Sequence, residues 1–420
     1  MRFTLVTIIA TVAALGAYAS TDSESAGQST SAESPGTIEL GAGEAVQIRS
    51  LLSLTGGSAP GMSLHYVVEL AVGDYHDIHG HAIELGDPVD SGCAPERGSE
   101  GAQQIAADAR VIGVIGTGCS AAAVAASPLL SAAGLVMVSP SNTSPVLTSD
   151  LAGNAGPHYH PGYFRVANND LYSAIAVADF AYGELGLRRM AAVHDGDPYT
   201  TGLVNAFGNA FRDRGGEVVA IAAIDKGETD MTAVLAEFAA AGPDGLFFPL
   251  FVAEGSAFAQ QARAFDGLRK AMLITGDAML ELEFLGEPHS EGIYFAGPEP
   301  AQGTSVNIAT GKDAVAVLDD FQATYGTTPT SLYWAYTYDA TTLLLSAIDS
   351  VAVAEGGKLS LDREALRVAL TATHGFQGIT GVLSCDAFGD CGTGRVNIYY
   401  HQDSGITDAA QLPVVYRFSP

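Results

Sequence analysis

Hydroxyl side chains follow the ends of two neighbouring predicted strands, 111–115 and 135–138. Ser120 comes after a glycine-rich turn, at the start of a predicted alanine-rich helix, where unpaired N–H groups and the helix dipole favour an anion such as a carboxylate. Ser141 and Thr143 follow the second strand and could donate hydrogen bonds to the same anion. Helix caps or Ser/Thr turns would explain the same hydroxyls equally well.

Two carboxylates and a tyrosine extend this set in the second half of the chain. Asp170 begins a predicted helix and Asp277 follows the predicted strand 271–275, so each could accept hydrogen bonds from a ligand ammonium or could be a helix cap or turn residue. Tyr199 could lie across a ligand or pack at the start of a helix. Because ligands bind at the carboxyl ends of the strands in open α/β sheets, we expect all six side chains to converge on one cleft.

Motifs for catalysis are weak or missing in the sequence. The run from Gly116 to Ala121 matches the G-x-G-x-x-A pattern of dinucleotide sites, but the next strand ends at Met137–Pro140 without the carboxylate that would hold a ribose. There is no HExxH, G-x-S-x-G or P-loop sequence. We therefore predict a protein that is not an enzyme and has no cofactor, with a secreted enzyme as the disfavoured alternative.

Two histidine-rich segments could hold a metal, at 76–81 and 158–160. The first lies in a predicted turn at the end of the sheet opposite the ligand loops, and the second lies in a long polar loop. Solvated turns explain both segments better than metal ligands do. We predict no metal site.

The charge balance excludes some classes of partner. Acidic residues outnumber basic ones 47 to 19, which gives a formal net charge of −28. Nucleic acids and anionic lipids are bound through clustered Lys and Arg, so neither is expected as a partner.

The N-terminus has the pattern of a secretory signal peptide over residues 1–19. Arg2 precedes a short apolar run, and Ala17 and Ala19 form an A-x-A cleavage site. A retained membrane anchor is the alternative. Residues 20–43 are rich in Ser, Thr, Glu and Gly and are predicted to be a disordered leader. The protein is therefore expected to be periplasmic or otherwise extracytoplasmic.

Export makes the four cysteines candidates for disulfides. Cys385 and Cys391 enclose a short, turn-rich loop and are expected to pair with each other. This leaves Cys93 and Cys119, each of which follows a predicted strand. Tighter C-x-x-C pairs, as in zinc sites, are absent from the sequence.

Alternating strand and helix patterns predict an α/β fold with two parallel units. The alternation runs from residue 44, is interrupted by a polar segment at 149–162, and then restarts. Three helical stretches and short antiparallel strands make up the last third, which the two units share. The predicted domains are lobe 1, 44–167 plus 297–378, and lobe 2, 168–296 plus 379–420.

Several segments resemble the type I periplasmic binding proteins, and in particular the leucine/isoleucine/valine-binding proteins of ABC importers. The most extensive is VIGTGCSAAAVAASPLLSAAGLVMVSPSNTSPVLT, at residues 114–148. Others follow in the family's order over essentially all of residues 45–400: YFRVANND, MAAVHDGDPYTTG, RGGEVVAI, LITGDA, EGIYFAGP and GVLSCDAFGD.

The resemblance implies two Rossmann-like lobes, joined by three crossings, that close on a ligand like a flytrap. It implies a disulfide between Cys93 and Cys119 beside the cleft. By position, Ser120, Ser141 and Thr143 would hold an amino acid α-carboxylate. Asp170 and Asp277 would hold its α-ammonium, and Tyr199 would contact the ligand from lobe 2.

The sequence departs from the family in the pocket walls. The family's Gly-Tyr after the strand near Pro249 is Leu250-Phe251 here, and Tyr199 is followed by Thr200 rather than Gly. The leading hypothesis is a monomeric, exported protein that captures a small amino acid, of the branched-chain type, and delivers it to an ABC permease. The alternatives are a ligand-sensing receptor and a binder of small amides or urea with the same fold.

Overall fold

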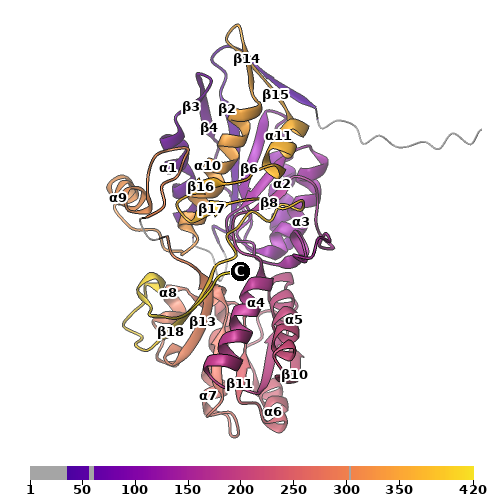
Figure 1. The fold of residues 1–420 in the computed structure, drawn as a ribbon, viewed down its shortest axis with the longest axis vertical. Coiled ribbons are helices and arrows are strands. Elements are labelled where there is room, and N and C mark those ends of the chain that lie inside the picture. The colour runs from indigo at the N-terminus through magenta and orange to yellow at the C-terminus, as the bar shows by residue number, and fades with distance from the viewer. Residues whose placement is uncertain (1–35, 56–60, 302–303) are drawn as a thin grey trace, which may run out of the picture. The chain divides into compact units, whose positions relative to one another are not determined.

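A computed structural model describes residues 36–55, 61–301 and 304–420 (Figure 1). Its first large sheet has the strand order β3-β4-β2-β6-β7-β8, with β5 paired to β2. All neighbours are parallel except the edge strand β3, which pairs antiparallel with β4. The strands are β2 (Val46–Leu52), β3 (Asp77–Ile78), β4 (His81–Leu85), β5 (Val89–Asp90), β6 (Val111–Gly116), β7 (Val136–Ser139) and β8 (Tyr163–Arg165).

Helices cover both faces of this sheet, because successive side chains of each buried strand point to opposite faces. Ile112 of β6 packs in a core with helices α1 and α10, whereas its neighbour Val111 packs in a separate core with α2 and α3. We call this sheet and its helices lobe 1. The helices are α1 (Ser63–Tyr75), α2 (Pro95–Ala106), α3 (Ser120–Ala132), α9 (Ala314–Tyr325), α10 (Trp334–Val351) and α11 (Arg363–Thr371).

The second large sheet has the order β10-β9-β11-β12-β13-β18-β19. It is parallel through β13 and antiparallel over its last two strands, as the sequence predicted for the C-terminal strands. The strands are β9 (Arg189–His194), β10 (Glu217–Ala223), β11 (Gly245–Phe247), β12 (Met272–Thr275), β13 (Ile293–Pro298), β18 (Val396–His401) and β19 (Val414–Phe418).

Helices also cover both faces of the second sheet, and together they form lobe 2. Met190 of β9 packs with α4 and α5, whereas Ala191 packs with α6 and α7. Figure 1 shows α4 and α5 side by side along the sheet. The helices are α4 (Asp170–Asp179), α5 (Pro198–Asp213), α6 (Thr232–Ala241), α7 (Val252–Ala264) and the short α8 (Leu282–Leu285).

The chain passes between the two sheets three times. The crossings follow β8, β13 and β17 (Gly381–Leu383), and they confirm the predicted architecture of two α/β lobes. Lobe 2 resumes later than the predicted residue 379. Strand β17 pairs with β16 (Phe376–Gly378), and Leu383, Cys385 and Cys391 belong to the core of lobe 1. The return to the second sheet comes only at β18.

A small third sheet corrects the predicted disordered leader. Strand β1 (Thr37–Leu40) pairs antiparallel with β15 (Lys358–Asp362), which also pairs with β14 (Val353–Glu355). Ile38 and Leu40 are buried in the lobe 1 core, so the chain is ordered well before the predicted boundary at residue 43. The predicted signal peptide and most of the predicted leader lie outside the described residues.

Both predicted disulfides are present, Cys93–Cys119 and Cys385–Cys391. The helices of the described part of the chain include none that is both long and apolar enough to cross a membrane.

Candidate ligand-binding site

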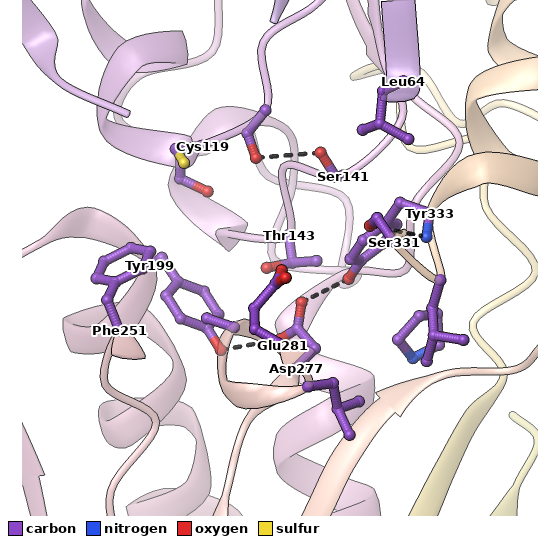
Figure 2. A pocket seen from close by; sticks show the side chains of 16 residues that line it. Leu64, Cys119, Ser141, Thr143, Tyr199, Phe251, Asp277, Glu281, Ser331 and Tyr333 are labelled. Carbon is purple, nitrogen blue, oxygen red and sulfur yellow. Dashed lines mark hydrogen bonds between the residues drawn. The ribbon is translucent and has the colours of Figure 1, made fainter. Parts of the chain in front are cut away.

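A cavity of about 700 Å³, counted with its open mouth, is lined by residues of both lobes. Figure 2 shows hydroxyls, aromatic rings and carboxylates that face it. The lining includes no Lys, Arg or His among the residues that the structure describes. The lining residues are Leu64, Gly118, Cys119, Ser120, Ser141, Thr143, Tyr199, Phe251, Asp277, Ala278, Leu280, Glu281, Pro298, Ser331, Leu332 and Tyr333.

The lobe 1 wall is built from the N-terminus of α3 and the loop after β7. Helix α3 starts at Ser120, and Cys119 before it provides no side-chain cap, so the first N–H groups of the helix have no intrahelical partner. The Ser120 hydroxyl accepts a hydrogen bond from the N–H of Ser144 (3.3 Å), and the Ser141 hydroxyl donates to the carbonyl oxygen of Gly118 (3.1 Å). These contacts lock the loop against the helix. The N–H groups at the start of α3 and the hydroxyl proton of Ser120 remain as donors suited to an anion.

On the lobe 2 wall, Asp277 lies between two tyrosines. The hydroxyl of Tyr199 donates to Asp277 Oδ1 (2.8 Å), and the hydroxyl of Tyr333 donates to Oδ2 (2.6 Å) (Figure 2). Burial raises the pKa of Asp277, and the two tyrosine hydrogen bonds oppose this rise. Burial and the adjacent Asp277 raise the pKa of both tyrosines, so they remain neutral donors. The result is an oriented carboxylate with lone pairs left for a further donor.

Asp170 occupies a different place from the other five predicted site residues. It is fully buried and does not line the cavity. Its Oδ2 accepts a hydrogen bond from the hydroxyl of Thr143 (2.8 Å), and its Oδ1 has no hydrogen-bond partner among the described residues. Burial, and then the charge of Asp277, raise the pKa of Asp170 well above its usual value. Asp170 therefore contacts the cavity wall through Thr143.

Tyr333, Phe251 and Glu281 line the cavity, although none of them is among the predicted site residues. Tyr333 directly precedes α10. It lies 56 residues from Asp277 and more than a hundred residues from the other predicted site residues, and no local motif marks it. Phe251 packs at 5.6 Å, centroid to centroid, from the Tyr199 ring, at the position where the family pattern already indicated a changed wall. Glu281 precedes the short helix α8, and its side chain makes no cap hydrogen bond; burial, and then the charges of Glu283 and Asp277, raise its pKa to about 7.

A buried arginine holds the loop that carries Ser141 and Thr143. Arg165 of β8 is fully buried, and its guanidinium donates to the carbonyl oxygens of Asn142 (3.2 Å) and Ser144 (2.7 Å). The same group pairs with Asp390 through Nε (2.6 Å) and Nη2 (3.1 Å). Burial disfavours the charge, but the carboxylate outweighs it, and the pKa of Arg165 is raised. In the sequence, the feature that could have indicated this role is an arginine at the end of an otherwise apolar strand.

The long polar loop at 149–162 and the Cys385–Cys391 loop pack against each other. Tyr159 meets Phe388 edge to face at 5.4 Å, and the Ser149 hydroxyl donates to Asp386 (2.8 Å). Two segments that are far apart in the sequence thus form one structural unit.

The histidine-rich segments do not assemble a metal site in the described residues, where no cluster of three or more metal-binding side chains occurs. His76 and His79 are exposed in the β3–β4 hairpin region, and the ring of His81 is tied to the carbonyl oxygen of Glu44 (2.7 Å).

Comparison with known proteins decides the family. A model of the periplasmic binding proteins matches residues 45–396, which span both lobes and the cavity between them. The chain belongs to the periplasmic binding protein family.

Curated relatives of this periplasmic binding protein are amino acid-binding proteins by name. It is 29% identical over 245 residues to the Leu/Ile/Val-binding protein homolog 3 of Brucella melitensis, a match that covers 57% of this chain and only 62% of the relative. It is 24% identical to a Pseudomonas aeruginosa protein named amino acid binding protein, over 78% of this chain and 81% of the relative.

Solved structures show the same fold. The leucine-binding protein LivK of Thermotoga maritima superposes with a TM-score of 0.73 at 24% identity, over 89% of this chain and 99% of the other. The branched-chain amino acid-binding protein LivJ of Streptococcus pneumoniae, solved with isoleucine, gives a TM-score of 0.71 at 21% identity, over 90% of this chain and all of the other. These likenesses confirm the predicted two-lobe fold.

Proposed function

We propose that this periplasmic binding protein captures a small amino acid between its lobes and delivers it to an ABC permease. The names of its relatives favour the branched-chain type. Its function is binding, without catalysis, and its place is outside the cytoplasm. The geometry of the site supports a small-molecule ligand as one partner. The family, and a similar protein of known structure that is described as an ABC transporter component, support a permease as the other partner.

One observation carries the proposal. The cavity has unpaired helix N–H groups and hydroxyls on one wall and a hydrogen-bonded carboxylate on the other. An amino acid zwitterion has complementary charges. Its α-carboxylate would bind at Ser120, Ser141 and Thr143, and its α-ammonium would bind Asp277, with Tyr199 beside it.

Asp170 has a supporting role in this proposal. Because its carboxyl is buried and bonded to Thr143, it orients that hydroxyl without direct contact with the ligand. This differs from the sequence-based expectation that Asp170 itself holds the ammonium.

The two walls belong to different lobes, so only a closed arrangement lets a ligand contact both. A ligand with such differential contacts shifts an open–closed equilibrium toward the closed state. A permease could then distinguish loaded from empty protein.

A thermal-shift screen tests the proposal. Leucine, isoleucine and valine are compared with acetamide and urea, using wild-type protein and the Asp277→Asn variant. A ligand at about 100 times its dissociation constant stabilises the folded state by about 2.7 kcal/mol. We expect a rise in Tm with amino acids that is lost in Asp277→Asn. A rise with acetamide or urea alone would refute the amino acid assignment, as would an Asn variant that binds amino acids as tightly as wild type.

A further inference from the structure

Glu281 introduces a second carboxyl group into the cavity that the proposed contacts to the zwitterion do not use. It lines the cavity together with Asp277, and Figure 2 shows its side chain extending into the cavity. Asp277 receives two tyrosine hydroxyls, whereas no donor lies within hydrogen-bonding distance of the Glu281 carboxyl among residues 36–55, 61–301 and 304–420. Glu281 is thus an acceptor without a donor.

The described residues that line the cavity also carry no positive charge to balance this group. None of the described lining residues is Lys, Arg or His, and the internal segments 56–60 and 302–303 contain none of these residue types in the sequence. Asp170 adds a third carboxyl one hydrogen bond behind the wall, with one oxygen unpartnered and buried. An aliphatic zwitterion carries one ammonium and one carboxylate, so it leaves the excess of acidic groups unchanged.

Burying a carboxyl without a donor costs free energy, and a closing cleft would bury Glu281 further. Two ways exist to avoid that cost: the group can take up a proton, or the ligand can supply a cation. A pKa of about 7 places Glu281 between its protonated and its ionised state near neutral pH in the empty protein.

We propose that this amino acid site prefers a cationic side chain to the branched aliphatic one that the names of the relatives favour, and that Glu281 binds the side-chain nitrogen, while aliphatic amino acids bind more weakly. This inference rests on the proposed function, because it assumes that the α-carboxylate and α-ammonium bind at the two walls as described. The added contact makes Glu281 the specificity-determining residue: an ion pair in a closed, water-poor cavity rewards a basic side chain and penalises an aliphatic one of equal length.

Two matched pairs of ligands isolate the side-chain charge. Lysine differs from norleucine, and ornithine from norvaline, only by a terminal ammonium. Calorimetric titrations measure all four on wild-type protein, on Glu281→Gln and on Glu283→Gln. Glu283 is the matched control because it lies two residues away in the same short helix and is exposed.

We expect the wild-type protein to bind at least one basic amino acid tenfold or more tighter than its uncharged counterpart. Glu281→Gln should abolish that preference and leave norleucine and norvaline within about threefold of wild type. Glu283→Gln keeps the carboxyl of Glu281 and should therefore keep the preference, although it removes a charge that raises the pKa of Glu281. Binding of the cation at pH 7 should also release protons from Glu281, detected as a dependence of the measured enthalpy on the ionisation enthalpy of the buffer.

Other outcomes overturn the inference. If norleucine and norvaline bind as tightly as lysine and ornithine, the ligand has no cationic side chain. If Glu281→Gln weakens all four equally, Glu281 contacts the α-ammonium instead. In both cases the proposed amino acid site stands. If none of the four ligands nor leucine binds, the proposed function fails, and the inference fails with it.

Discussion

The ion pair between Arg165 and Asp390 should be the most sensitive polar contact in lobe 1. Asp390→Asn keeps the shape of the side chain but removes its charge. Arg165 is fully buried and the Asp390 side chain is only 9% exposed, so water cannot replace the lost partner. The Oδ2 atom of Asp390 also accepts from Thr148 (2.9 Å) and Asn169 (2.7 Å), so an amide NH₂ at that position would face three donors.

The expected loss follows from these contacts. Breaking a buried ion pair by altering one partner costs about 3–5 kcal/mol. For a chain of 420 residues, an unfolding entropy of about 2.1 cal/mol/K per residue converts this into a fall in Tm of roughly 3–6 °C. Because the same guanidinium holds the loop that bears Thr143, ligand affinity should fall as well.

Differential scanning calorimetry measures the change, with Asp266→Asn as the matched control. Asp266 pairs with Arg269 at 3.1 Å, but the two side chains are 95% and 64% exposed. Exposed pairs contribute about 0–1 kcal/mol, so the control should lower Tm by no more than about 1 °C. Equal, small shifts for both variants would refute the view that the buried pair supports the site.

Three further predictions concern the site and its surroundings. Thr143→Val leaves the buried Asp170 oxygen without its donor and should lower the free energy of unfolding in urea by about 1–3 kcal/mol. Thr143→Ser keeps the hydroxyl and should retain most of that stability. Equal stability of all three proteins would show that the hydrogen bond is dispensable. The pKa of Glu281 is raised from 4.5 to about 7, so its contribution to stability is complete below pH 4.5 and is lost as the pH rises to 7. The Tm of the wild type should therefore fall relative to that of Glu281→Gln over this pH range. Parallel profiles of Tm against pH would contradict the raised pKa. Replacing Cys385 and Cys391 by Ser opens a loop with a sequence separation of 6 and should cost about 2 kcal/mol, seen as a lower Tm; an unchanged Tm would mean that the loop packing alone holds this segment.

Local periodicity was sufficient to predict most of the fold. The apolar runs, the glycine turn before Ser120 and the alternation of strands and helices predicted the strands and helices of both large sheets, and the resemblance predicted the three crossings. Strand β1 was missed because its partner β15 lies more than three hundred residues away, and a four-residue strand has no periodic signal of its own. The late return to lobe 2 was missed because the disulfide loop packs by tertiary contact with lobe 1.

Part of the candidate site was also predicted from local sequence patterns. Ser120, Ser141, Thr143, Tyr199 and Asp277 line the cavity because strand ends and helix starts place them there. The burial of Asp170 behind Thr143 is a matter of tertiary packing, and its hydrogen bond joins residues 27 positions apart, so no local pattern reveals it. Tyr333 and Glu281 reach the cavity from distant or irregular segments, where residue type alone does not separate a lining side chain from a surface one.

The central claim is that one cavity recognises both charges of an amino acid. Calorimetric titration of the wild-type protein with leucine, 3-methylbutan-1-amine and 4-methylpentanoate tests it most directly, because the last two compounds lack only the carboxylate or only the ammonium of leucine. Loss of either contact, the ammonium with Asp277 or the carboxylate with the hydroxyls and helix N–H groups, should cost at least about 2 kcal/mol, or roughly 30-fold in affinity. Leucine should bind, and both analogues should bind at least this much more weakly. Binding of either analogue as tight as that of leucine would contradict it.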